Sequence, residues 1–235
     1  MNILVRIKSK LSSGFSPYFY IRKFISNLKS NNFKKKPVKF TREISEINKI
    51  GYAVLNSKKE ILNEVLDRCS KLAKNHQIHH KETGKTFWNI IAKDENLVKW
   101  NEIKSYISSD YFKSIAEGYL GTEAILARVD LILSFPTKVD KNHSQLWHLD
   151  ADDTKICTFY LYCSDVDENS GPFKLAPKNK SYKINLPKWF RKHVYKDKIF
   201  FKNFCRQEHL VSLTGKSRFE FVCDTANIYH CGSSC

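Results

Sequence analysis

The sequence contains no apolar run long enough to cross a membrane. Its longest unbroken apolar stretch is five residues, Phe159 to Cys163, whereas a membrane-spanning helix needs about 18. The first ten residues interrupt their apolar positions with Arg6, Lys8 and Lys10, which is unlike the apolar stretch of about 7–15 residues in a secretory signal. We therefore expect a protein that is neither exported nor membrane-spanning, and we predict a cytoplasmic location.

Cysteine pairs of the C-x-x-C type are also absent. The seven cysteines are an odd number and are scattered along the chain, which excludes a zinc ribbon and argues against a disulfide framework. We expect them to act as small buried hydrophobic side chains in a reducing compartment.

Arginine is scarce although the chain is strongly basic. Only eight of the 40 Lys and Arg residues are Arg, and the formal net charge is +16. Reading of base edges and bidentate phosphate binding favour the Arg guanidinium, and no helix-turn-helix, zinc finger or aromatic ribonucleoprotein pattern occurs. We therefore predict no sequence-specific nucleic-acid binding, and the alternative is that the lysines form solvated faces.

The positive charge is concentrated in two segments. Residues 1–40 carry ten basic residues and no acidic one, and residues 178–206 carry ten basic residues and one acidic one. Apolar residues recur at helical spacing in the first segment, which is compatible with peripheral contact to an anionic membrane or with a helical arm packed on the domain, and we favour the arm. The predicted organisation is an N-terminal arm, 1–40, and one domain, 41–235.

Residues 178–206 contain four aromatic side chains among their lysines, Trp189, Phe190, Phe200 and Phe201. Such a segment either covers the mouth of a binding site and meets an anionic ligand, such as a phosphate or a CoA ester, or forms a solvated surface flap. We favour the flap slightly.

Helices are predicted in the first half of the chain. Ser57 and Glu60 form a capping box that predicts a helix to about Asn75, and a second helix is predicted from Ile103 to Tyr119 with its end at Gly121. The three histidines at 76, 79 and 80 are placed in a solvated loop, because no carboxylate at helical spacing supports a metal site there.

From residue 124 the hydrophobic period changes from about 3.6 to two, which predicts strands. The predicted strands are Ala124–Phe135, Ser144–Asp150, Lys155–Val166, Gly171–Ala176, Arg218–Asp224 and Asn227–Cys231, with an earlier one at Ile50–Leu55. Turns are predicted at 167–172 and 224–226. The order predicts an α+β fold in which N-terminal helices pack on a jelly roll or barrel.

Three side chains on these strands have the composition of an iron site. His148 and Asp150 are two residues apart on a predicted strand and therefore point to the same face. His230 lies on the last predicted strand. Two histidines and one carboxylate form the facial triad of non-haem Fe(II) oxygenases, so we predict His148, Asp150 and His230 as metal ligands.

The order of motifs resembles phytanoyl-CoA dioxygenase-like Fe(II)/2-oxoglutarate oxygenases over roughly residues 45–235. The matching pieces are Gly51-Tyr52, Tyr119-Leu120-Gly121, Ser144 to Asp150, Tyr160 to Phe173, Leu175 to Lys178, Gly215, and Asp224 to Gly232. The resemblance implies a double-stranded β-helix, cupin-like, that uses Fe(II), 2-oxoglutarate and O₂ to hydroxylate a small or conjugated metabolite. It also implies Gln145 and Thr158 as cosubstrate-binding residues, each equally compatible with a purely structural role. No obligate protein partner is indicated.

The sequence departs from this family after His230. An Arg that holds the far carboxylate of 2-oxoglutarate is expected about ten residues further on, with the last strand of the roll, but the sequence ends at Cys235. Three explanations are open, in order of preference: a truncated reading frame, replacement of the Arg by another basic residue such as Lys174, or an inactive relative. The rival functions are a jelly-roll module that binds a metal or ligand without oxidising it, and a membrane-associated interaction protein.

Overall fold

A computed structural model describes most of the predicted domain and not the predicted N-terminal arm. The expectations for residues 1–38 therefore lie outside the described part of the chain. The described residues are 39–57, 59–80, 88–93, 99–134, 143–150, 153, 155–181 and 195–232.

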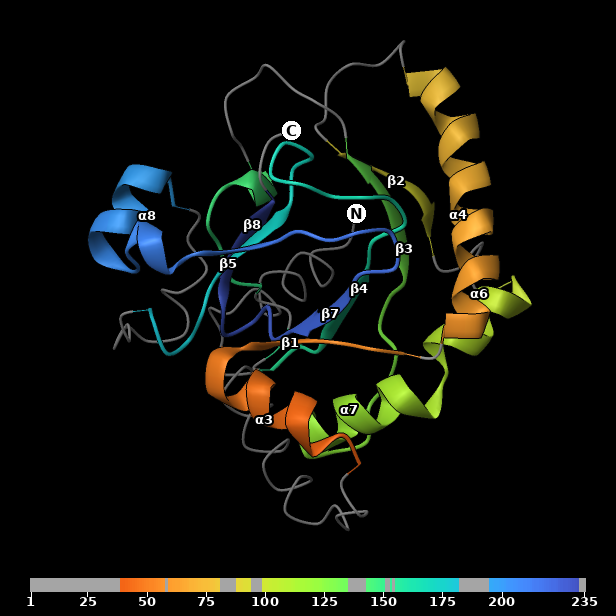
Figure 1. The fold of residues 1–235 in the computed structure, drawn as a ribbon. Helices are drawn as coiled ribbons and strands as arrows, with labels where there is room; N and C mark the ends of the chain where they lie inside the picture. Colours follow the sequence, from red (N-terminus) through yellow and green to blue (C-terminus); the bar gives the residue numbers. More distant parts are fainter. Residues whose placement is uncertain are drawn as a thin grey trace, which may run out of the picture.

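Two three-stranded antiparallel sheets form the centre of the molecule (Figure 1). The first has the order β1-β7-β4 and the second the order β6-β5-β8. Their strands are β1 (Tyr52–Val54), β4 (Thr158–Leu161), β5 (Phe173–Ala176), β6 (Val211–Leu213), β7 (Glu220–Cys223) and β8 (Tyr229–Gly232). A separate antiparallel pair joins β2 (Trp88–Lys93) to β3 (Asp130–Ser134).

A hydrophobic cluster fills the space between the two three-stranded sheets. Phe221 and Cys223 of β7 and Leu175 of β5 are fully buried in it, and Tyr160 of β4 stacks on Phe221 with ring centroids 4.7 Å apart. These residues alternate along their strands with residues of the opposite face, as the period of two requires. The inner faces of both sheets therefore meet, and they carry the candidate site at one end.

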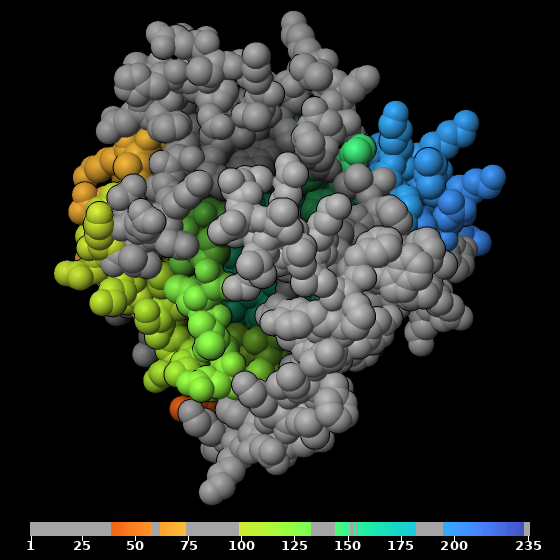
Figure 2. Space-filling view, turned by 180° about the vertical axis from the view of Figure 1, so that it is seen from behind, coloured from red at the N-terminus to blue at the C-terminus, as the bar shows by residue number. Residues whose placement is uncertain are grey.

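Helices cover the outer face of the first sheet (Figure 1). Ile47 and Ile115 are fully buried against Val222 of β7. In Figure 2, seen from behind, residues 99–134 form the yellow-green to green surface and α8 the blue surface on the opposite side. The helices are α3 (Thr41–Ile50), α4 (Lys59–His80), α6 (Asn101–Ile107), α7 (Asp110–Leu120) and α8 (Asp197–Asn203), with 3-10 turns η1 (His143–Gln145) and η3 (Gln207–His209).

The helical predictions are confirmed in position and corrected in extent. The helix expected after Ser57 begins at Lys59, but it continues to His80, so the solvated loop predicted for residues 76–80 is wrong. The helix expected from Ile103 to Tyr119 is two helices that are separated at Ser108 and Ser109. Serine competes for backbone hydrogen bonds and favours helix ends, which explains the break. Gly121 ends α7 with φ 72°, as predicted.

The strand predictions need two corrections. Of the described residues in the strand predicted at Ala124–Phe135, only 130–134 form a strand, which pairs with β2. The preceding Ile125 and Leu126 are 87% and 58% exposed. The strand predicted at Ser144–Asp150 begins as η1 and then makes single bridges at Trp147 and His148. An alternating pattern cannot supply the partner strand that extended structure needs.

The turn after β4 forms as predicted. Asp167 accepts hydrogen bonds through Oδ1 from the backbone N–H of Asn169 at 2.9 Å and from the hydroxyl of Ser170 at 2.6 Å. This is the Asx turn that the Asp-Glu-Asn-Ser-Gly-Pro sequence favours. Cys69, Cys205, Cys223 and Cys231 are buried in apolar clusters, in agreement with the role expected of them.

The segment 195–206 packs against the second sheet and Trp147 instead of forming a solvated flap. Phe200 on α8 is fully buried and stacks on Trp147 with ring centroids 4.3 Å apart and an interplanar angle of 9°. Trp147 is 2% exposed, so it is a core residue next to His148. Trp189 and Phe190 lie outside the described residues. Within the described part, no helix is both long and apolar enough to span a bilayer.

Candidate metal centre

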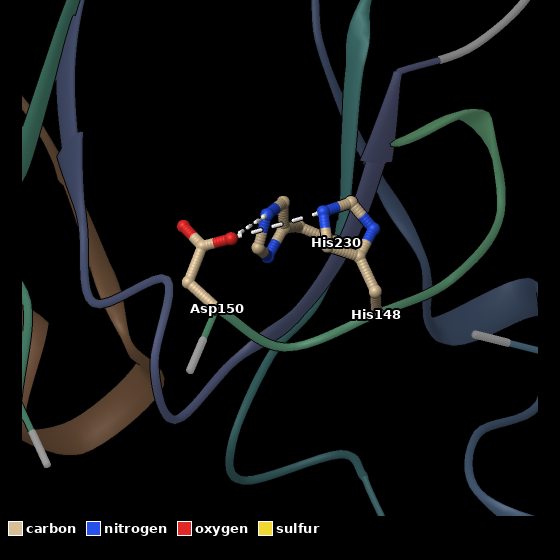
Figure 3. A group of neighbouring side chains, drawn as sticks. All are labelled: His148, Asp150 and His230. Carbon is tan, nitrogen blue, oxygen red and sulfur yellow. Dashed lines mark ion pairs between the residues drawn. The ribbon is translucent and has the colours of Figure 1, made fainter. Parts of the chain in front are cut away.

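His148, Asp150 and His230 converge at one end of the two sheets (Figure 3). One candidate ligand atom from each residue lies within 4.8 Å of those of the other two. Asp150 Oδ1 is 3.9 Å from His148 Nε2 and 3.8 Å from His230 Nε2. The residues predicted from their types and spacing are therefore brought together by the fold.

Backbone hydrogen bonds hold the three residues in this arrangement. His148 and His230 form an antiparallel bridge with N···O distances of 3.0 and 3.1 Å. The Asp150 N–H donates to the carbonyl of Thr225 at 2.9 Å. Both contacts join the segment 147–150 to the last part of the chain, so the ligands' main-chain positions are fixed by pairing and not by a metal.

The imidazole rings are oriented for metal binding through Nε2. Nδ1 of His148 lies 2.7 Å from the carbonyl oxygen of Leu146, and Nδ1 of His230 lies 3.1 Å from that of Ile228. A carbonyl oxygen only accepts hydrogen bonds, so each Nδ1 carries a proton, and Nε2 is the nitrogen whose lone pair is available to a metal in the neutral imidazole. Histidine ligands of metal sites are commonly fixed by such a contact.

Burial keeps His230 neutral at physiological pH. Its side chain is 6% exposed, and burial, together with the neighbouring His148, lowers its pKa to about 4, against the opposing effects of the Asp150 carboxylate and the Ile228 carbonyl. A neutral imidazole is the form that binds metals. The His148 and Asp150 side chains are 17% and 36% exposed, so the centre opens on the side of the carboxylate.

The donor set fits an Fe(II) ion with small adjustments. Three ligand atoms that each lie about 2.1 Å from one ion at right angles are about 3 Å apart. The observed separations require a closure of about 1–2 Å, and the carboxylate of Asp150 is the most exposed of the three groups and has room to rotate. Two imidazoles and one carboxylate leave further positions open for other ligands.

The two predicted cosubstrate residues lie near this centre. Gln145 is close to it in the sequence, three residues before His148, and Thr158 is close to it in space. Gln145 is on η1 and is 2% exposed. Thr158 is on the inner face of β4, and its hydroxyl oxygen is 3.1 Å from that of Thr225, the residue whose carbonyl accepts the Asp150 N–H. Their roles toward a cosubstrate remain predictions.

Lys174 does not face the triad. On β5 the residue opposite His230 is Leu175, whereas Lys174 is opposite Cys231. Since neighbouring residues of a strand point to opposite faces, Lys174 lies on the other side of the sheet, where its ammonium is 3.9 Å from Glu168. The suggestion that Lys174 replaces the missing Arg at this centre is therefore wrong.

Two aromatic residues beside the centre have no counterpart in the sequence-based predictions. The Phe173 ring stacks on the His230 ring with centroids 5.3 Å apart and an angle of 15°. Tyr160 packs on Phe173 at 4.9 Å, and burial raises the pKa of its hydroxyl. The alternation of β4 and β5 places both on inner faces, but the contact of Tyr160 with Phe173 depends on how the two sheets pack.

Comparison with known proteins supports the fold. No family model matches the chain, and no curated protein matches its sequence. Similar solved structures include EctD from S. alaskensis in its apoform, with a TM-score of 0.56 and 13% identity over 86% of this chain and 74% of EctD. EctD with bound Fe matches with a TM-score of 0.55 and 13% identity over 86% and 74% of the two chains. EctD with 2-oxoglutarate and 5-hydroxyectoine matches with a TM-score of 0.55 and 12% identity over 86% of this chain and 73% of EctD. At these identities the likeness is one of fold.

Proposed function

We propose that this protein is an Fe(II)- and 2-oxoglutarate-dependent oxygenase that hydroxylates a small or conjugated metabolite. The observation that carries the proposal is the convergence of His148, Asp150 and His230, with both Nε2 atoms directed at one carboxylate oxygen. The fold that the chain shares with EctD supports it, since EctD has been crystallised with Fe and with 2-oxoglutarate. We further propose membership of the phytanoyl-CoA dioxygenase-like family, with residues 41–235 as one double-stranded β-helix domain.

In this proposal His148, Asp150 and His230 hold Fe(II). The chemistry that the iron supplies in this class is oxidative decarboxylation of 2-oxoglutarate to succinate and CO₂ with O₂, coupled to insertion of one oxygen atom into a C–H bond of the substrate. The chain contributes two imidazoles whose Nδ1 atoms donate to the carbonyls of Leu146 and Ile228, so that Nε2 of each ring is the atom directed at the metal. Phe173 covers one face of His230 and excludes water from it.

For the cosubstrate, we propose that Gln145 and Thr158 contact 2-oxoglutarate beside the metal. Thr158 lies on the inner face of β4 and is partly exposed. A hydroxyl there can donate to a carboxylate while accepting from Thr225. The small-molecule substrate then enters on the open side of the centre, next to Asp150.

The proposal is tested by measuring succinate formation from 2-oxoglutarate with anaerobically loaded Fe(II). Uncoupled turnover needs no knowledge of the substrate. We expect wild type to form succinate and His148→Ala and Asp150→Ala to lose this activity at least a hundredfold. His209→Ala, a histidine on η3 outside the triad, is the matched control and should retain it.

Two results separate this function from its rival. Fe(II) binding without succinate formation indicates a metal-binding module that does not oxidise a substrate. Equal succinate formation by wild type, His148→Ala and Asp150→Ala removes the triad from the reaction and contradicts the proposed function.

A further inference from the structure

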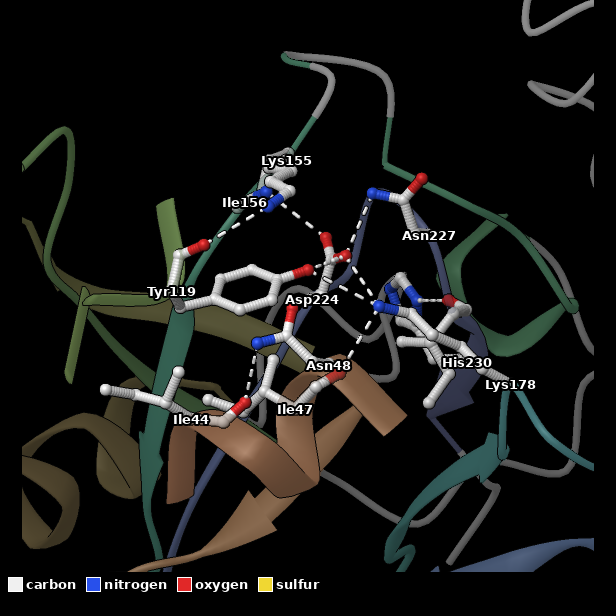
Figure 4. Close-up of polar contacts among 11 residues, drawn as sticks. Ile44, Ile47, Asn48, Tyr119, Lys155, Ile156, Lys178, Asp224, Asn227 and His230 are labelled. Carbon is white, nitrogen blue, oxygen red and sulfur yellow. Dashed lines mark hydrogen bonds and ion pairs between the residues drawn. The ribbon is translucent and has the colours of Figure 1, made fainter. Parts of the chain in front are cut away.

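An ion pair between Lys178 and the buried Asp224 lies near His230 (Figure 4). Asp224, at the end of β7, is fully buried, and its Oδ2 is 3.0 Å from Nζ of Lys178. Oδ2 also accepts hydrogen bonds from the hydroxyl of Tyr119 and, at 2.9 Å, from Nδ2 of Asn227. Oδ1 accepts from the backbone N–H of Ile156 at 3.2 Å. A buried carboxylate with four donors is satisfied and held in one orientation.

The partners of this carboxylate come from elements far apart in the sequence. Tyr119 is on α7, Ile156 precedes β4 and Lys178 follows β5. Nζ of Lys178 also lies 3.4 Å from the carbonyl oxygen of Ile47 in the last turn of α3. The ion pair therefore joins the helical layer to both sheets at one point.

The backbone of the same residue begins the turn that supports two metal ligands. The carbonyl oxygen of Asp224 accepts the N–H groups of Asn227 at 2.9 Å and Ile228 at 3.0 Å. Within this turn, Thr225 accepts the N–H of Asp150, and Ile228 accepts the Nδ1–H of His230. Two carbonyls of one five-residue turn thus orient one carboxylate ligand and one imidazole ligand.

We propose that the Lys178–Asp224 ion pair is the positioning element of the metal centre. By fixing the turn 224–228, it holds the backbone of Asp150 and the ring of His230 in the orientation from which they close on a metal. Neither residue contacts the ligand atoms. Their effect passes through the carbonyls of Thr225 and Ile228, and the inference rests on the proposed role of the triad.

Under this proposal, loss of the charge of Lys178 or of Asp224 changes the geometry of the metal centre as well as the stability of the fold. Removing Lys178 leaves a buried carboxylate without its counter-ion, a change that is strongly destabilising for buried pairs. The Asp224 side chain then relieves the uncompensated charge by moving toward water, and the turn moves with it. Loss of a group that hydrogen-bonds directly to a metal ligand typically changes metal affinity by about 10–100-fold, and the ion pair acts through two such groups, the carbonyls of Thr225 and Ile228.

Glu220 provides a matched control on the same strand. It is 3% exposed and accepts hydrogen bonds from the hydroxyl of Tyr106, from the Ser57 hydroxyl at 2.7 Å and from the Ser57 N–H at 3.0 Å. It is therefore a second buried carboxylate bonded to a tyrosine. Its partners lie on the helical side of the sheet and not in the turn 224–228, so its loss affects stability without reaching the ligands.

The test is titration of the metal-free full chain with Co(II) alone, followed by its d–d absorption spectrum. We expect Asp224→Asn and Lys178→Met to weaken Co(II) binding at least tenfold and to alter the spectrum. Lys178→Arg, which keeps the charge, should recover most of the affinity. Glu220→Gln should bind Co(II) within twofold of wild type with an unchanged spectrum, even if its thermal midpoint falls as far as that of Asp224→Asn.

Each failure has a distinct meaning. Unchanged Co(II) affinity and spectrum in the folded Asp224→Asn or Lys178→Met variant overturn the positioning role and leave the proposed function standing. If Asp224→Asn does not fold, Lys178→Met, whose side chain is 24% exposed, decides the matter. A tenfold loss of Co(II) affinity in Glu220→Gln also overturns the positioning role, because the loss of affinity then follows from reduced stability of the fold. Wild type that does not bind Co(II) contradicts both proposals.

Discussion

His148 and His230 exchange both backbone hydrogen bonds of an antiparallel bridge, and their rings lie 4.3 Å apart between centroids. Residues paired in this way point to the same side of the ladder. The bridge therefore brings two imidazoles from distant parts of the sequence together before any ion is bound. The site is preorganised at the level of the main chain, and side-chain rotation completes it.

The protonation pattern of the two rings is a first prediction. In the metal-free protein, both His148 and His230 should carry a proton on Nδ1, because the carbonyl oxygens of Leu146 and Ile228 accept a hydrogen bond from that nitrogen. Long-range ¹H–¹⁵N correlation spectra of the imidazoles measure this directly. His148→Gln and His230→Gln assign the signals, and a ring whose Nδ1 is unprotonated at either position contradicts the geometry.

Metal alone should stabilise the folded chain. An ion that binds only the native state at a concentration of 100 times its Kd adds about 2.7 kcal/mol to the free energy of unfolding. We expect Co(II) to raise the thermal midpoint of wild type and of His209→Ala, but not that of Asp150→Ala. An equal rise in Asp150→Ala would assign the stabilisation to another site.

Phe200→Ala should destabilise the protein by about 3–5 kcal/mol, the usual range for removing a buried aromatic side chain. Phe200 is fully buried and stacks on Trp147, so the substitution leaves a cavity beside the segment that carries His148. Urea denaturation measures the loss. Phe201→Ala, on the same helix but only partly buried, is the control, and an equal or larger loss there would contradict the packing described.

Gly51→Ala should cost about 1–3 kcal/mol in the free energy of unfolding. Gly51 has φ +96°, which favours glycine, and a Cβ there would lie 2.8 Å from Cδ1 of Ile228. Thermal or urea denaturation measures the effect. Adding Ile228→Val removes the methyl group that the new Cβ meets, so the double variant should recover part of the loss. If the double variant recovers none of the lost free energy of unfolding, backbone strain at residue 51 alone accounts for the loss.

Local signals in the sequence predicted the turns, the main strands and the three side chains that the fold brings together at the candidate centre. The alternation around β5, β7 and β8 gave their positions within a few residues, because each strand has one face in the core. The H-x-D spacing at 148–150 placed two ligands on the same side, although the segment is only partly a strand. Helix α3, which buries only Ile44 and Ile47, and strand β6, which has three residues, were not predicted.

The sequence by itself determined which residue types are available for chemistry and which faces of the strands are apolar, because these follow from side-chain identity and a period of two. Only the tertiary structure decided that His148 pairs with His230, that Lys174 points away from them, and that Lys178 finds Asp224. Each of these depends on strand register and on contacts between distant segments, and such contacts are selected by the packing of the whole core.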